Sequence, residues 1–204
     1  MPKSSARERS FTHVVHLVQR LDTAAPPGPP PETLGLPQRM GAAGRRLFAL
    51  LNVTVTLGAA WALYQLWTEQ TPGWWFNLIF TVMIGGLTLA LWAILRGSIR
   101  QAEHEARLQA VWRDIGPRAV ATAGRVTERH CVMAEGGEVM RFELVVQAPG
   151  GAPIHGQWQP ANARLYLLQP QVPGVGAEVR IWRAPNTPAN APLVIEVADP
   201  SVVH

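Results

Sequence analysis

Two long apolar segments dominate the hydropathy pattern of this chain. They cover residues 47–67 and 75–95, and neither contains a charged residue. Each is about 21 residues long, and a helix of that length rises roughly 30 Å, enough to cross the hydrocarbon core of a bilayer. Such helices also occur in soluble cores, but the rest of a 204-residue chain is too small to cover two of them. The pattern therefore predicts a transmembrane hairpin over residues 47–95, connected by the loop 68–74.

Small residues recur four positions apart in both apolar segments. The first contains Gly58 and Ala62, and the second contains Gly86 and Ala90. Two antiparallel helices would bring these pairs to nearly the same depth, and small residues let helix backbones approach closely in lipid. We therefore expect the two spans to pack on each other there. The alternative is that one pair faces a second copy or another membrane protein.

The N-terminal segment, residues 1–23, has a short stretch of apolar positions at helical spacing, preceded by Ser10 as a candidate N-cap. This spacing predicts an amphipathic helix over residues 10–21. The helix would lie on the inner leaflet, dock a partner or pack on the chain's own C-terminal domain. Its apolar positions are Phe11, Val14, Val15, Val18 and Leu21.

A proline-rich linker follows over residues 24–46, and its prolines are concentrated between residues 26 and 37. Proline at this density excludes helix and favours an extended, semi-rigid spacer. A docking arm for an aromatic-lined groove is the alternative interpretation.

After the second span, the pattern predicts that a helix continues as a juxtamembrane helix over residues 96–116. Leu108, Val111, Trp112 and Ile115 form an apolar stripe near its end. Gly116-Pro117 is a helix-stop signal. Glu103-His104-Glu105 does not predict a metal site, because consecutive helix residues point about 100° apart.

Residues 117–204 change to strand patterning. Residues 138–147 and 177–183 alternate between apolar and polar positions, and Gly- or Pro-containing turns separate the short apolar runs. Five or six strands at this spacing predict a small antiparallel β-barrel or sandwich of OB- or SH3-like type. The fold class is therefore an α+β membrane protein, with a transmembrane helical hairpin and a β domain.

Charge distribution then predicts the orientation of the hairpin. Arg39, Arg45 and Arg46 precede the first span, Arg96 and Arg100 follow the second, and the loop has no Lys or Arg. The positive-inside rule places both termini in the cytoplasm, and we expect a bacterial inner membrane. The expected interface anchors are Arg45, Arg46 and Arg96 at the inner side and Trp67, Trp74 and Trp75 at the outer side.

The residues that could carry chemistry do not form a catalytic pattern. Cys131 is the only cysteine and His130 is its neighbour, but adjacent strand residues point to opposite faces. The pair His13 and His16 has no third metal ligand. We therefore expect no enzymatic activity, no cofactor and no metal. The spans contain no charged residue or histidine, which argues against transport. Seven arginines balance seven acids in residues 117–204, so nucleic acid is not an expected partner.

The C-terminal motifs resemble those of known sequences. GAEVRIWRAPNTP at residues 176–188 and LVIEVAD at residues 193–199 are similar to the tail of uncharacterised bacterial membrane proteins with one or two spans and a small β domain. The resemblance covers residues 117–200 with the preceding spans, and it implies no catalytic residue. A more distant analogy in fold is to short membrane proteins whose cytoplasmic OB-like barrel partners stomatin-type scaffolds.

These patterns together predict a non-enzymatic two-pass inner-membrane protein. Its expected role is a scaffold or interaction module in a membrane assembly, acting through the cytoplasmic β domain. Its expected partners are the lipid bilayer and other membrane proteins, or a second copy of itself. The candidate docking surfaces are sheet edges, the proline-rich arm and the helix at residues 10–21. Alternatives are a ligand-sensing membrane regulator and, less favoured, a membrane-bound hydrolase.

Overall fold

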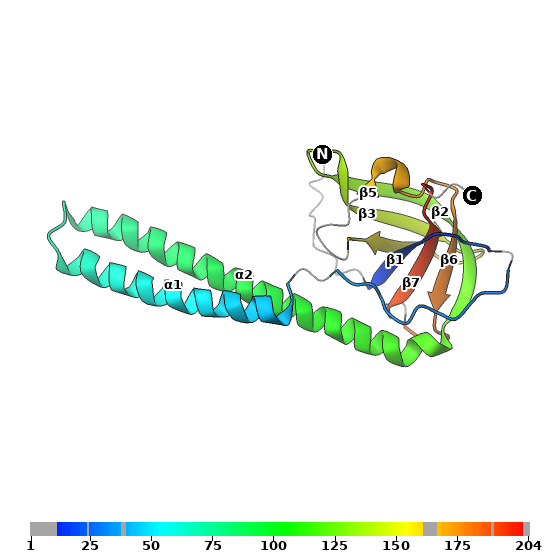
Figure 1. Cartoon of the computed structure of the whole chain (residues 1–204), viewed down its shortest axis with the longest axis horizontal. Coiled ribbons are helices and arrows are strands. Elements are labelled where there is room, and N and C mark those ends of the chain that lie inside the picture. Colours follow the sequence, from blue (N-terminus) through cyan, green and yellow to red (C-terminus); the bar gives the residue numbers. More distant parts are fainter. Residues whose placement is uncertain (1–11, 24, 38–39, 161–166, 189, 202–204) are drawn as a thin grey trace. The chain divides into compact units, whose positions relative to one another are not determined.

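The structure, a computed structural model, describes residues 12–23, 25–37, 40–160, 167–188 and 190–201. It divides into two compact units. One is Met40–Glu105, and the other joins the segment before residue 40 to residues 106–204. Figure 1 shows a helical hairpin in the first unit and a barrel of strands in the second.

The hairpin consists of helices α1 (Ala42–Thr68) and α2 (Trp74–Ile115). Both are long and apolar enough to cross a membrane, and only 6% of the apolar window of each is buried. Core helices of soluble proteins bury such a surface, whereas these expose leucine, valine and tryptophan along their length. Residues of α2 from Ala106 onward belong to the second unit.

Polar side chains fix the register of the two helices. The Asn52 amide nitrogen donates to the Leu91 carbonyl oxygen over 3.3 Å, and Asn52 is only 1% exposed. The Trp92 indole N–H donates to the Thr56 hydroxyl over 3.0 Å. Nearer the loop, the Trp67 indole N–H donates to the Thr81 hydroxyl over 3.1 Å. In an apolar environment such bonds are satisfied only in one alignment, so they specify the register.

The predicted packing of the glycines is wrong for the contact between α1 and α2. Gly58, Gly86 and Ala90 are exposed, and only Ala62 is partly buried. A methyl group added at Gly58 or Gly86 would meet no atom within 4 Å. The spacing correctly implied equal depth but could not specify which face of each helix meets the other. Whether these small residues face a second copy stays a prediction.

The second unit is a closed barrel of six strands, in the order β2-β6-β7-β1-β4-β3, with β2 pairing again to β3. Neighbouring strands are antiparallel except at β1, which is parallel to both β7 and β4. The two-residue strand β5 adds to β3. The strand bounds are β1 His13–Val18, β2 Val120–Met133, β3 Glu138–Gln147, β4 Ile154–Trp158, β5 Leu167–Leu168, β6 Glu178–Arg183 and β7 Leu193–Ala198. Short 3-10 turns occupy Gly116–Arg118 and Gln169–Gln171.

Strand β1 corrects the prediction of an amphipathic helix over residues 10–21. Residues 13–18 pair with β7 over the whole of that strand, from His13 opposite Leu193 to Val18 opposite Ala198. Val15 is buried inside the barrel and Val14 is buried on its outer side. A strand buried on both faces shows no polar–apolar alternation, so its apolar positions matched helical spacing instead. Leu21 follows the strand, and Phe11 lies outside the described residues.

Two clusters of apolar side chains stabilise this unit. The inner cluster fills the barrel and includes Val15, Phe142 and Ile195. The outer cluster joins the end of α2 to the outer surface of the barrel and to the proline-rich segment. Its members are Val14, Leu34, Leu108, Trp112, Ile115, Trp182, Ala184 and Val194.

The barrel wall is tightest at Gly156 on β4. A Cβ atom there would lie 2.5 Å from Ile195 Cδ1 and 2.9 Å from Val15 Cγ2. Only glycine fits, because these atoms belong to buried residues of the inner cluster.

We expect Gly156→Ala to destabilise the barrel by about 1–3 kcal/mol, the usual cost of overpacking a core. The matched control is Gly136→Ala in the β2–β3 turn, where an added Cβ would meet nothing within 4 Å. Hydrogen exchange of β4 and β7 amides in the full chain in detergent measures the difference. Equal protection in both variants would contradict this close contact.

Candidate functional site: a groove at the open edge of strand β2

The predicted membrane anchors lie at opposite ends of the hairpin. Trp67, Trp74 and Trp75, at the loop end, are 57%, 73% and 52% exposed. At the other end Arg46 and Arg96 are exposed, and Arg45 is half-buried. Exposed indoles and guanidinium groups at the two ends of an apolar surface have the arrangement of interface anchors. Their contact with lipid stays a prediction.

Two of the three predicted docking surfaces are occupied by the chain itself. Residues 13–18 form strand β1, which is paired on both sides, so the apolar helix face predicted for docking is not present there. The proline-rich segment is bound to the end of α2: Leu34 is fully buried, and the Trp112 indole N–H donates to the Pro31 carbonyl oxygen over 2.8 Å. The Leu34 amide N–H donates to the Gln109 side-chain oxygen over 3.0 Å. This segment is therefore a clamp on the helix, and the sheet edges are the surfaces that remain.

The residues considered for chemistry are kept apart by the fold. Cys131 packs against the inner cluster, and its neighbour His130 is exposed. Cys131 is paired with Phe142 and His130 with Glu143 in the β2–β3 ladder. Within the described ranges, no three His, Cys, Asp or Glu side chains gather where they could hold a metal ion.

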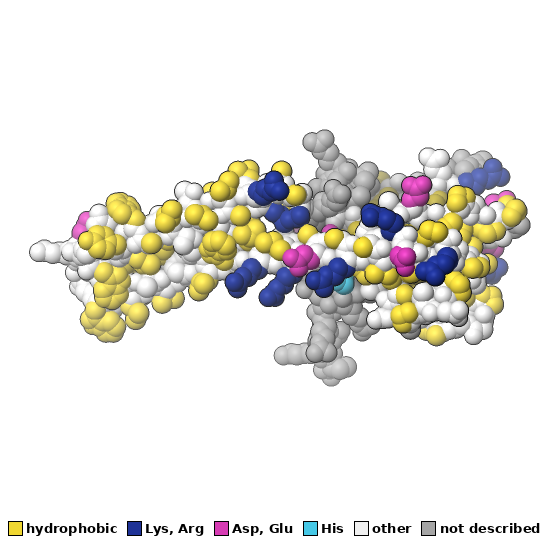
Figure 2. Space-filling model, turned by 90° about the horizontal axis from the view of Figure 1, so that it is seen from below, with side chains coloured by type: hydrophobic (Ala, Val, Ile, Leu, Met, Phe, Trp, Pro, Cys, Tyr) yellow, Lys and Arg dark blue, Asp and Glu magenta, His cyan; other side chains and the backbone are white. Residues whose placement is uncertain are grey.

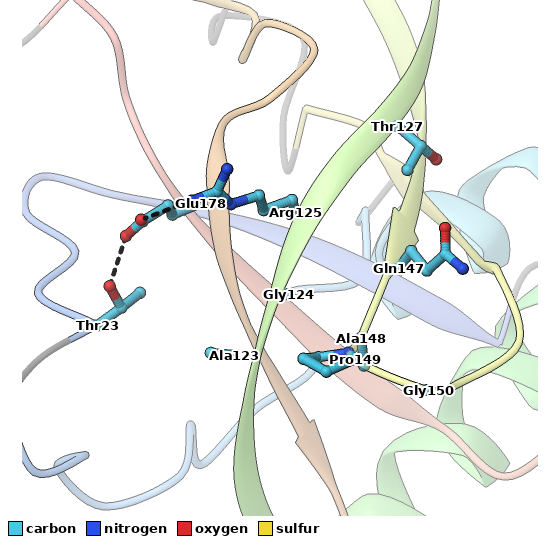
Figure 3. A pocket seen from close by; sticks show the side chains of 10 residues that line it. All are labelled: Thr23, Ala123, Gly124, Arg125, Thr127, Gln147, Ala148, Pro149, Gly150 and Glu178. Atoms are coloured by element: carbon cyan, nitrogen blue, oxygen red, sulfur yellow. Dashed lines mark hydrogen bonds and ion pairs between the residues drawn. The ribbon is translucent and has the colours of Figure 1, made fainter.

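A groove of about 470 Å³ lies on the barrel surface at β2. Figure 3 shows Gln147 and Thr127 on one side of β2 and Glu178 and Thr23 on the other, with Ala123, Gly124 and Arg125 between them. The end of β3 and the turn at residues 148–150 form its remaining wall. Residues from the N-terminal segment, β2, β3 and β6 thus meet at one surface.

The groove exists because β2 changes its hydrogen-bonding partners. Residues 120–125 pair with β6, and residues 125–133 pair with β3. β3 reaches Arg125 with Gln147 and then turns away. The first five residues of β2 therefore have a paired strand on one side only.

Backbone direction identifies the free groups on that side. The Val126 N–H donates to the Ala177 carbonyl oxygen, and the Gly176 N–H donates to the Val126 carbonyl oxygen. The backbone N–H and C=O groups of Val126 therefore point toward the β6 side. The N–H and C=O groups of successive strand residues alternate in direction. Those of Arg125, Ala123 and Ala121 therefore point away from β6. Arg125 meets Gln147 there, whereas Ala121 and Ala123 are beyond the end of β3. No strand among the described residues pairs with their N–H and C=O groups, which form an open strand edge.

Two local features hold this edge in place. A bulge between Val126 and Glu128 changes the register of β2 against β3, and the Thr127 hydroxyl donates to the Val145 carbonyl oxygen over 3.1 Å. Gly124 lets the strands approach, because a Cβ there would lie 2.9 Å from the Gln147 carbonyl oxygen. Bulges commonly end a ladder or bend a strand in this way.

One wall of the groove has paired charges. Arg125 lies 3.8 Å from Glu178, and the Thr23 hydroxyl also donates to the Glu178 carboxylate. The groove is thus almost neutral, with small side chains along β2. A neutral groove beside free backbone groups suits an extended peptide, which bonds through its own main chain.

Neither a protein family, nor a curated protein, nor a solved structure matches the chain. The resemblance of residues 117–200 to bacterial membrane proteins, and the OB- or SH3-like character of the barrel, stay predictions.

The ion pairs near the groove should differ in their effect on stability. Arg125 and Glu178 are 72% and 54% exposed, so we expect Arg125→Ala to cost at most about 0.5–1 kcal/mol. Arg180 and Glu196 are 16% and 14% exposed, and Arg180 also donates to the Asp22 carbonyl oxygen. Arg180→Ala should therefore cost about 2 kcal/mol, because it leaves Glu196 unpaired in a largely buried place.

Hydrogen exchange of β6 amides in the full chain measures both effects against the wild type. The assignment would be contradicted if Arg125→Ala lowered protection as much as Arg180→Ala.

Proposed function

We propose that this chain is a two-pass bacterial inner-membrane protein with both termini in the cytoplasm. It acts as a non-enzymatic interaction module of a membrane assembly. Its β domain binds an extended segment of another protein of that assembly at the open edge of β2.

The membrane part of the proposal is supported by the exposed apolar surface of α1 and α2 (Figure 2). The barrel supports the orientation independently of the arginines. β1 precedes the hairpin and β2–β7 follow it, yet all belong to one barrel. Both ends of a membrane-spanning hairpin must then lie on the same side. The arginines before the first span and after the second favour the cytoplasm as that side.

The open edge at Ala121 and Ala123 is the observation that carries the binding role. Free strand edges invite pairing with another chain, and natural proteins usually protect them. Here Ala123 on this edge lines a groove of about 470 Å³, whereas Ala121 packs against the outer cluster. A ligand-sensing regulator could use the same groove, because large apolar side chains of the described residues fill the barrel interior.

The orientation can be tested with single cysteines in a Cys131→Ala background. We expect cysteine at Gln70, in the loop, to react with an impermeant maleimide in intact spheroplasts. Cysteines at Glu32 and Glu135, both exposed in the β-domain unit, should react only after lysis. Labelling of Glu32→Cys and Glu135→Cys on different sides of the membrane would contradict a barrel built from both ends of the chain.

The binding role predicts position-specific cross-linking in native membranes. A photoreactive residue at Gln147, in the groove, should capture a distinct protein identified by mass spectrometry. The same residue at Glu135, in the exposed β2–β3 turn, should not capture it.

Ala123→Pro should abolish that capture. The backbone N–H that proline lacks at position 123 points away from β6. The β2–β6 ladder therefore keeps its hydrogen bonds. Unchanged β6 protection in hydrogen exchange is the control for folding. The proposal fails if capture from Gln147 persists in this variant, or if no protein is captured and the native complex contains one copy of this chain alone.

A further inference from the structure

Four arginines lie near one level at the end of the hairpin away from its loop. They are Arg45 and Arg46 at the start of α1, and Arg96 and Arg100 on α2. The contacts Asn52–Leu91 and Thr56–Trp92 fix how the antiparallel helices align. Continued at about 1.5 Å per residue, this alignment places all four within about two helical turns. We call these four residues the arginine collar.

The collar has no carboxylate partner among the described residues. The ion pairs that the described residues form involve other arginines, namely Arg118, Arg125 and Arg180. Arg45 donates to the Met40 carbonyl oxygen over 2.6 Å, which leaves its charge uncompensated.

Nearby acids do not neutralise the collar. Glu69 is at the loop end of the hairpin, and the Glu105 carboxylate bonds the Gln101 amide over 3.0 Å and none of the four arginines. Glu103 is exposed one turn beyond Arg100 and forms no ion pair with it in the structure. Arg96 and Arg100 are at i and i+4 on one helix, where like charges repel each other. The collar therefore presents unpaired positive charge, to which an external anion is attracted.

Apolar side chains border the collar on the side toward the loop. Leu47 and Leu50 on α1 are 71% and 66% exposed, and Ile94 on α2 is 57% exposed. An anion that carries an apolar tail would contact the arginines with its charged group and these apolar side chains with its tail. Figure 2 shows Lys and Arg side chains gathered where the hydrophobic surface of the hairpin ends.

We propose that the arginine collar binds the headgroups of anionic phospholipids in the inner leaflet. Guanidinium groups match phosphate oxygens in pairs, and this geometry favours arginine over lysine. The acyl chains would lie against the leucine and isoleucine side chains next to the collar. This inference rests on the proposed membrane location and adds a selectivity for headgroup charge.

The test uses the full chain in nanodiscs of phosphatidylcholine with a minor share of phosphatidylglycerol. Lipids retained by the protein after gentle detergent extraction are counted by native mass spectrometry. We expect phosphatidylglycerol to be enriched on the wild type at low salt. The enrichment should fall about tenfold or more in the triple variant Arg46→Gln, Arg96→Gln, Arg100→Gln, because each cation adds to the attraction to an anionic surface.

The control variant replaces three exposed arginines elsewhere, Arg113, Arg141 and Arg183, by glutamine and should keep the enrichment. Equal retention of phosphatidylglycerol by both triple variants would overturn the proposal. Loss of the bound lipid to millimolar inorganic phosphate would also overturn it, because that identifies a phosphate site with no need for acyl chains.

Flotation with vesicles of phosphatidylcholine alone, washed with carbonate, separates this proposal from the proposed membrane location. If all variants insert but none selects phosphatidylglycerol, only the lipid proposal fails. If the wild type does not insert, both fail.

Discussion

The insertion of β1 between β7 and β4 is the contact on which the rest of the structure depends. It closes the barrel, buries Val15 in the inner cluster and presents Val14 to the outer one. It also connects the segment before the hairpin to the domain after it. The clamp of Leu34 and Pro31 on Trp112 reinforces the same connection. The hairpin is therefore an insertion into a single β domain rather than a module preceding it.

Some of this fold could be predicted because a local pattern determines it. The hairpin follows from two segments without charge, and the end of α2 at Ile115 follows from Gly116-Pro117. The strands β3 and β6 show apolar–polar alternation because one face of each points into the barrel. A closed barrel with two long apolar helices agrees with the α+β class expected from these patterns.

Other parts depend on partners far away in the sequence. Nothing within residues 13–18 indicates that both faces will be buried, so their apolar positions favoured a helix. The glycine spacing predicts the depth of these residues but not the direction in which they face. Gly58 and Gly86 lie away from the contact between α1 and α2. The groove also depends on distant partners, because it arises where the hydrogen-bonding partner of β2 changes from β6 to β3. The only local signals were the length of the strand and Gly124 within it.

The position of β1 also sets an order for assembly. Its partner residues, His13 and Leu193, are 180 positions apart in the chain. During synthesis the first strand of the barrel emerges early, but its neighbour β7 is made only after both helices and every other strand. Because β1 pairs with β7 along its whole length, the barrel closes only after the chain has been made through α1, α2 and β7.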